Sequence, residues 1–153
     1  MVGQILADTN ILLRGVEPGH PSHVVAANAT YTLGKQGGIV CVLPQNLIEF
    51  WNVCTRPEQQ NGLGWSAGRA DKELERLETI FTVLPESPAI YSEWRALVRD
   101  NSVLGKQVHD ARIVAAMNVH GITALLTFNL KDFKRFQHIE LVDPDSLVNS
   151  DIE

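Results

Sequence analysis

The feature that most constrains the fold is the alternation of short apolar strands with helical segments along the whole chain. We predict five strands, at residues 4–7, 39–43, 81–84, 124–128 and 139–142. Strands that alternate with helices are typical of a parallel sheet that is covered on both faces. The expected fold class is therefore α/β, a three-layer α/β/α arrangement around a central, mainly parallel sheet of about five strands.

The segments between the strands have the residue pattern of helices. Helices are predicted at residues 22–35, 44–56, 66–81, 88–100, 108–120 and 130–136. Pro44 opens the second of these helices, whose apolar face is expected to contain Leu47, Ile48, Phe50, Trp51 and Cys54. The glycine-rich and proline-rich stretch at residues 56–68 predicts an exposed loop.

Length and composition indicate an ordinary globular chain. The 153 residues fall in the range of one domain, and 44% of them are hydrophobic and 20% charged. We therefore expect a single domain over residues 1–153. The N-terminus has neither a basic leader nor a long apolar run, so a cytoplasmic protein without a membrane segment is expected. Cys41 and Cys54 lack metal-binding spacing and are expected to be reduced core thiols.

The formal net charge of −5 argues against a protein that holds nucleic acid by bulk positive charge. It does not exclude a nuclease whose site is built from acids, because bound metal ions reverse the local sign of the charge. Active sites of parallel α/β sheets gather at the carboxyl ends of the strands. In this chain that rule selects Asp8 and the segment from Thr127 to Asp132.

Asp8 ends a strand that is expected to be buried, where a carboxylate is costly unless it is paired, protonated or bound to a cation. The alternative is that Asp8 caps the helix that follows it. Thr9 and Asn10 add short polar groups at the same turn, which suit hydrogen bonds to a metal ligand. Turns also use these residue types without any functional role.

Two helices carry further candidate acids. Asp110 shares a helix face with the apolar Ile113, Val114 and Met117, although acids are also favoured in the first turn of any helix. Glu49 lies opposite the apolar face of its helix, so a solvated polar surface explains it as well as a cleft does.

The segment that follows the fourth strand supplies a hydroxyl, an amide and a carboxylate, from Thr127, Asn129 and Asp132. Because the carboxyl ends of parallel strands share one edge of the sheet, these groups are candidates for the same site. Asp132 and Asn129 are equally explained as helix caps or solvent-facing groups.

Four segments of the sequence resemble the PIN domain, and especially the single-domain ribonuclease toxins of bacterial toxin–antitoxin pairs. They are ILADTNILL, NLIEFWNV, VHDARIVAAM and ALLTFNLKDFKRF, and their order fits over nearly the whole chain. The resemblance implies metal-binding and catalytic roles for Asp8, Glu49, Asp110 and Asp132. It implies supporting roles for Thr9, Asn10, Thr127 and Asn129, and Asn129 stands where some relatives carry an acid.

The resemblance also implies a chemistry and a set of partners. Oxygen ligands select hard ions, so Mg²⁺ or Mn²⁺ is expected, and the expected reaction is hydrolysis of RNA phosphodiester bonds. The expected partners are an RNA substrate, a cognate antitoxin and a second copy of the chain in a homodimer. An alternative is a non-catalytic PIN-fold module that binds protein or RNA. A haloacid dehalogenase-type phosphatase is disfavoured, because it needs an aspartate where this chain has Asn10.

Overall fold

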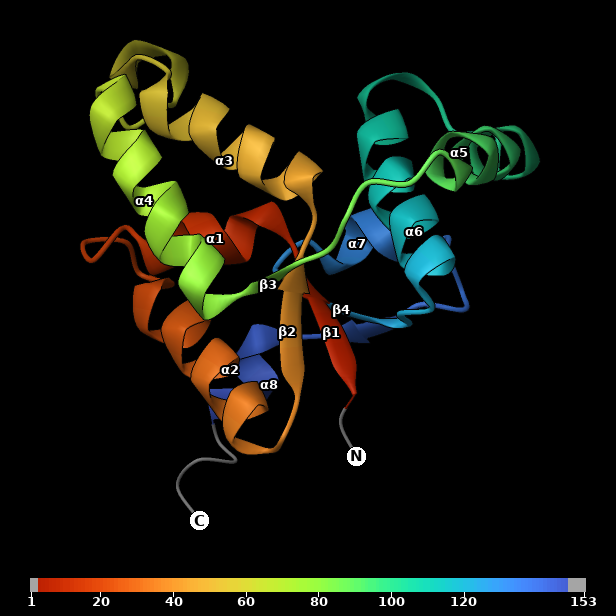
Figure 1. Cartoon of the computed structure of the whole chain (residues 1–153), viewed down its shortest axis with the longest axis horizontal. Helices are drawn as coiled ribbons and strands as arrows, with labels where there is room; N and C mark the ends of the chain where they lie inside the picture. Colours follow the sequence, from red (N-terminus) through yellow and green to blue (C-terminus); the bar gives the residue numbers. More distant parts are fainter. Residues whose placement is uncertain (1–2, 149–153) are drawn as a thin grey trace.

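The computed structural model describes residues 3–148 and shows a parallel sheet between layers of helices (Figure 1). In this part of the chain five strands form one sheet in the order β3-β2-β1-β4-β5, and every neighbouring pair is parallel. The strands are β1 (Gln4–Ala7), β2 (Ile39–Val42), β3 (Thr82–Val83), β4 (Ala124–Leu126) and β5 (Glu140–Val142). The predicted three-layer α/β fold with a central parallel sheet is confirmed.

The helices follow the predicted segments closely, with differences at their ends. They are α1 (Thr9–Gly15), α2 (His23–Lys35), α3 (Pro44–Thr55), α4 (Ala67–Ile80), α5 (Ala89–Asp100), α6 (Val108–His120), α7 (Leu130–Phe133) and α8 (Pro144–Val148), with short 3₁₀ turns η1 (Glu58–Gln60) and η2 (Gly105–Gln107). The prediction had α7 three residues too long and lacked α8 and both 3₁₀ turns. Among residues 3–148, no helix combines the length and apolarity that a bilayer span requires.

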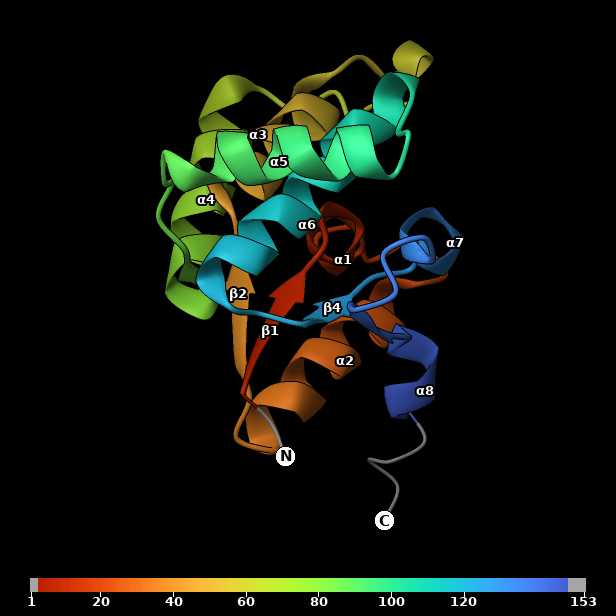
Figure 2. The same cartoon turned by 90° about the vertical axis from the view of Figure 1, so that its right-hand side faces the viewer.

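The strands send alternate side chains into two separate hydrophobic cores, as the period of two in a strand requires. On β1, Ile5 and Ala7 enter a core shared with α1, α2, α3 and α4, whereas Leu6 enters the core shared with α5, α6 and α7. Strands β2 and β4 divide their side chains between the same two cores. Figures 1 and 2 show α2 and α4 on one face of the sheet and α5 and α6 on the other.

One predicted core position is wrong. Ile48 was placed on the apolar face of its helix, but it is 69% exposed and lines a pocket. Helix α3 packs on α1 and α4 through the opposite side, where Phe50 and Cys54 are fully buried. A helix that forms the wall of a cleft has a wide exposed surface, and periodicity alone did not locate its edge.

The predicted state of the two cysteines is confirmed. Cys41 and Cys54 are both free and buried. Burial raises the pKa of the Cys41 thiol, and burial together with nearby acids raises that of Cys54 to about 12. Neither group supplies a thiolate at neutral pH, so neither is suited to nucleophilic catalysis.

The chain reverses its direction across the sheet between β1 and β4. From β1 it proceeds outwards to β2 and β3, and it then returns to add β4 and β5 on the other side. Ligands of open parallel sheets bind in the crevice outside the strand ends at such a reversal. Asp8 follows β1 and Thr127 follows β4, so both stand at this point.

Candidate active site

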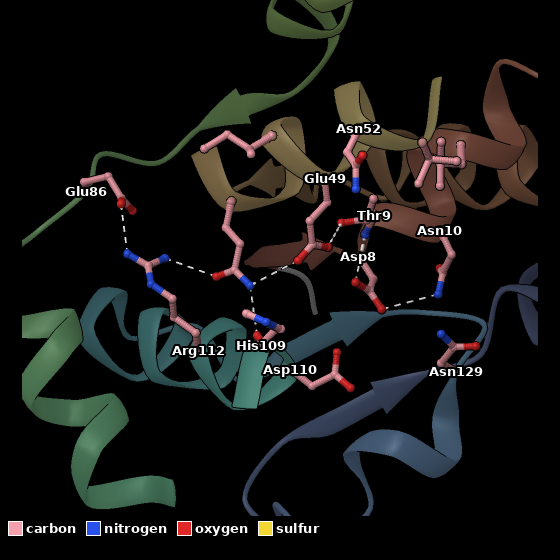
Figure 3. A pocket seen from close by; sticks show the side chains of 14 residues that line it. Asp8, Thr9, Asn10, Glu49, Asn52, Glu86, His109, Asp110, Arg112 and Asn129 are labelled. Carbon is pink, nitrogen blue, oxygen red and sulfur yellow. Dashed lines mark hydrogen bonds and ion pairs between the residues drawn. The ribbon is translucent and has the colours of Figure 1, made fainter. Parts of the chain in front are cut away.

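A polar pocket of about 740 Å³ opens at the carboxyl ends of β1 and β4. Its lining residues come from segments far apart in the sequence, namely the start and inner face of α1, one face of α3, the segment between β3 and α5, the start of α6 and the turn after β4 (Figure 3). The acids among them are Asp8, Glu49, Glu86 and Asp110. The side chains of Asp8, Glu49 and Asp110 face a common space in Figure 3.

Asp8 is held by a dense set of hydrogen bonds and is only 6% exposed. Its Oδ1 accepts from the backbone N–H of Thr9 at 2.8 Å, which makes it the N-cap of α1. Its Oδ2 accepts from the hydroxyl of Thr127 at 2.8 Å and from the amide of Asn10 at 3.3 Å. The capping and the site interpretations are therefore compatible, because one carboxylate oxygen caps the helix while the other lies among polar groups.

The turn after β4 is tied to the turn after β1. The amide of Asn10 also donates to Thr127 Oγ1 at 3.2 Å, and its Oδ1 accepts from Phe128 N at 3.3 Å. Thr127 in turn accepts from the backbone N–H of Asn129 at 2.9 Å. The two strand ends thus form one hydrogen-bonded floor under the pocket.

Glu49 is half-buried and lies across the pocket on α3. Its Oε2 accepts from Thr9 Oγ1 at 3.0 Å, and its Oε1 accepts from Gln45 Nε2 at 3.4 Å. Thr9 therefore connects Asp8 and Glu49, since its N–H binds one carboxylate and its hydroxyl binds the other. Glu49 belongs to the polar wall of the cleft, which is one of the two environments that its helical position allowed.

Asp110 lies in the first turn of α6 and is half-buried at the edge of the pocket. Among residues 3–148, no group donates a hydrogen bond to its carboxylate. Partial burial, then the negative charges of Asp8, Asp132 and Glu49, raise the pKa of Asp110 to about 6, while His109 opposes the rise. The carboxylate is therefore in an environment that disfavours its charged form.

Asp8 experiences the same opposing influences. Burial raises the pKa of its carboxyl above the usual range, and the charges of Glu49 and Asp132 raise it further. The hydrogen bonds from Thr127 and Thr9 act in the opposite direction. The negative charges of Glu49 and Asp132 thus raise the pKa values of both Asp8 and Asp110, and Asp8 also raises that of Asp110.

The segment after β4 contributes less directly. Asn129 lines the pocket at the N-cap position of α7, but its side chain makes no capping hydrogen bond. Asp132 is exposed in α7 and does not line the pocket. It acts on the other acids through charge, and its predicted role as a metal ligand stays a prediction.

Three functional candidates were not found from the sequence. Gln45 Nε2 also donates to His109 O at 2.9 Å, and Gln45 Oε1 accepts from Arg112 Nη1 at 3.1 Å, which joins α3 to α6 across the pocket. Arg112 also pairs with Glu86 at 2.9 Å. The third candidate, Asn46, is a fully buried polar residue behind Thr9. These contacts join residues 37 and 67 positions apart, and no local pattern reveals them.

The chemistry of the lining groups fits a hard divalent cation, because carboxylate, hydroxyl and amide oxygens are its preferred ligands. Arg112 is the one Lys or Arg among the pocket-lining residues, and it is already paired with Glu86. As the side chains stand, no three Asp, Glu, His or Cys residues within 3–148 form a group that would hold a metal ion. Binding through three of the acids would therefore require side-chain rotation, for which Asp110 is the least restrained.

Solved structures with the same architecture include toxin–antitoxin proteins. VapBC2 from Rickettsia felis, bound to a DNA fragment from their promoter, matches with a TM-score of 0.68 and 16% identity, over 91% of this chain and 97% of the other. VapBC-1 from nontypeable Haemophilus influenzae matches with a TM-score of 0.67 and 15% identity, over 93% and 98%. At these identities the likeness shows a shared fold.

A third similar structure is that of a toxin whose cleavage target is known. It is VapC20 from Mycobacterium tuberculosis, a sarcin-ricin loop cleaving toxin, which matches with a TM-score of 0.55 and 20% identity, over 79% of this chain and 86% of the other. No curated protein sequence matches this chain. The family model of the PIN domain matches residues 5–139, which include all the acids described above. The chain therefore belongs to the PIN domain family.

Proposed function

We propose that this chain is a metal-dependent endoribonuclease that hydrolyses RNA phosphodiester bonds as the toxin of a toxin–antitoxin pair. The observation that carries the proposal is the convergence of Asp8, Glu49 and Asp110 from three separate elements on one pocket. Like charges at close range are costly unless a cation neutralises them. Burial first, and the neighbouring negative charges after it, raise the pKa values of Asp8 and Asp110.

In this proposal Asp8, Glu49 and Asp110 hold Mg²⁺ or Mn²⁺, and Asp132 adds negative charge from the edge of the site. When bound, the ion would supply charge stabilisation at the scissile phosphate and would activate water for its attack. The protein's part is to fix the ligands. Thr127, Asn10 and the N–H of Thr9 hold Asp8.

Glu49 is fixed separately, between Thr9 and Gln45. Fixing both carboxylates before the substrate arrives reduces the reorganisation that the reaction requires. No thiol or other protein nucleophile is needed, in agreement with the buried state of both cysteines.

The partners are part of the proposal. Toxin–antitoxin complexes among the structural neighbours support a cognate antitoxin as the inhibitor, and the cleavage of the sarcin-ricin loop by VapC20 supports RNA as the substrate. We also propose a homodimer, which light scattering of the purified chain tests directly. A monomer at micromolar concentration would remove that part of the proposal.

The proposed activity is tested with purified protein and a structured RNA in Mg²⁺ or Mn²⁺. We expect cleavage that stops in EDTA, and we expect Asp8→Asn and Asp110→Asn to abolish it while the variants remain folded. Asp71→Asn is the matched control, because Asp71 is exposed on α4 and lies outside the pocket. Undiminished cleavage in EDTA, or in both site variants, would overturn the mechanism.

A non-catalytic PIN-fold module is the second candidate. It is favoured by the asparagine at position 129 and by the absence, within residues 3–148, of three acids already arranged around a common metal position. Calorimetric titration with Mn²⁺ separates the two candidates. The nuclease binds the ion, and this binding disappears in Asp8→Asn, whereas the module shows no binding at millimolar Mn²⁺.

A further inference from the structure

Asn46 lies directly behind the site and is a polar side chain with no solvent exposure. It occupies the third position of α3, one turn before Glu49, and it does not line the pocket. Its Oδ1 accepts from the backbone N–H of Leu43 at 2.8 Å, and its Nδ2 donates to Thr9 Oγ1 at 3.1 Å. A buried amide is costly unless both of its ends are satisfied, as they are here.

The orientation of the Asn46 amide follows from its partners. The N–H of Leu43 can bind only to an oxygen, so Oδ1 must face Leu43 and the NH₂ group must face Thr9. A hydroxyl has one proton, and an amide NH₂ cannot accept it. The proton of Thr9 is therefore directed away from Asn46, towards Glu49 Oε2 at 3.0 Å.

The result is a directional chain of hydrogen bonds from the backbone of Leu43 through Asn46 and Thr9 to Glu49. Because the N–H of Thr9 binds Asp8, the same residue relates the two carboxylates to each other. The other oxygen of Glu49 has only the longer contact with Gln45, at 3.4 Å. The hydrogen bond from Thr9 is therefore the shorter of the two that restrain Glu49, a long side chain with several rotatable bonds.

We propose that Asn46 is a positioning residue, which holds the Glu49 carboxylate in its orientation towards Asp8 through the hydroxyl of Thr9. The inference deepens the proposed nuclease function and rests on it for the consequence, which is weaker metal binding when the chain of hydrogen bonds is broken. Partners behind a metal ligand typically change metal affinity about 10–100-fold when they are removed.

A purely structural role for Asn46 is the competing explanation, because its Oδ1 also caps the start of α3. Two substitutions separate the roles. Asn46→Ala removes the cap and the donor, whereas Asn46→Asp keeps the acceptor for Leu43 and removes the NH₂ donor to Thr9. The added negative charge of the aspartate would by itself strengthen cation binding, so weaker binding in this variant must come from the lost donor.

The test is a double-mutant cycle between Asn46 and Thr9, read as the Mn²⁺ dissociation constant by calorimetry. We expect Asn46→Ala and Thr9→Val each to weaken binding about 10-fold, and the double variant to be no weaker than either single one. Thr9→Ser keeps the hydroxyl and should preserve the affinity. Asn28→Ala on α2, outside the pocket, is the matched control.

Additive effects in the cycle, or unchanged affinity in Asn46→Asp, would overturn the proposal. For RNA cleavage we expect kcat to fall about 10-fold while KM changes little, because Asn46 does not line the pocket. If Asn46→Ala does not fold, Asn46→Asp replaces it in the cycle.

A crystal structure of Asn46→Ala in EDTA gives a readout that is independent of metal and activity. We expect the 3.0 Å bond from Thr9 to Glu49 to be lost while the backbone of α3 is retained. A bond that persists would overturn the proposal, even if the parent protein cleaves RNA. A parent that neither binds Mn²⁺ nor cleaves RNA would refute the proposed function. The crystal structure of Asn46→Ala would then decide alone whether Asn46 positions Glu49.

Discussion

The two halves of the pocket are built in opposite ways. On the β1 side, Asp8 is buried and accepts hydrogen bonds from three neighbouring residues. On the α6 side, Asp110 accepts none from residues 3–148 and is surrounded by other negative charges. One carboxylate is therefore fixed by the fold, whereas the other is restrained only by its helix.

This difference indicates how the site tolerates several acids in a small volume. Hydrogen bonds compensate part of the cost of burying Asp8, since they favour its charged form. At Asp110 the protein opposes the cost only through the charge of His109, and a bound cation would neutralise the remaining negative charge. The proposed metal thus acts mainly on the half of the pocket that the protein leaves unsatisfied.

The largest effect on stability is expected on the fixed side, in Thr127→Val. This substitution removes the donor at 2.8 Å from Asp8, together with the acceptor for Asn10 and Asn129, and nearly preserves the shape of the side chain. A buried charged group that loses a hydrogen bond costs about 2 kcal/mol, or roughly 4–8 °C in Tm for a domain of this size. Thermal unfolding in EDTA measures the change.

Thr32→Val is the matched control for that experiment. Thr32 is also buried, but its hydroxyl has no hydrogen-bond partner within residues 3–148. Its replacement should therefore leave stability unchanged or increase it, by up to about 1 kcal/mol. Equal destabilisation by the two substitutions would show that the hydrogen bonds around Asp8 contribute nothing specific.

A smaller effect is expected on the unsatisfied side, as a dependence of stability on pH. The pKa of Asp110 is raised from 3.8 to about 6, so the folded state binds more protons than the unfolded state between these values. Without metal, the contribution of Asp110 to the free energy of unfolding should therefore fall as pH rises from about 4 to about 6 and stay constant above that range. The raised pKa of Asp8 acts in the same direction.

Asp110→Asn isolates this contribution. The free energy of unfolding of the variant should equal that of the parent near pH 4 and exceed it by about 1–2 kcal/mol at pH 7.5. This value is reduced for the partial solvent exposure of Asp110. Denaturant unfolding in EDTA across this pH range measures the difference. A variant that is less stable than the parent at pH 7.5 would contradict the comparison between the two halves.

The smallest effect is expected for Asp132→Asn. Because Asp132 is exposed, its replacement should change the free energy of unfolding without metal by less than about 0.5 kcal/mol. Its removal should weaken Mn²⁺ binding less than Asp8→Asn does, since it contributes charge from outside the pocket. Calorimetry that gave equal losses in the two variants would place Asp132 among the ligands.

Much of this architecture could be predicted from the sequence. The strands are short apolar runs between turn residues, and the chain position of Asp8 at a strand end was enough to select it. The place of Glu49 in the pocket was less visible, because a polar helix face has the same pattern whether it borders water or a cleft. Strand and helix ends were the least accurate part, as at β3 and α7.

The supporting side chains could not be predicted for a physical reason. Asn46 and Gln45 acquire their roles only through partners on α1 and α6, and these partners become neighbours only after the sheet has formed. In sequence, each is an ordinary polar residue near the start of a helix. The exposed Ile48 was misplaced for the related reason that only the assembled cleft determines which side of α3 meets solvent.

The division of each strand between two cores limits how this protein can change during evolution or engineering. Deleting one residue within Gln4–Ala7 would invert the strand, so that Leu6 and its neighbours would enter the opposite layers. The same deletion would draw Asp8 back from the crevice. Insertions and deletions should therefore be tolerated in surface connections such as residues 17–22, and be lethal to both folding and activity in β1.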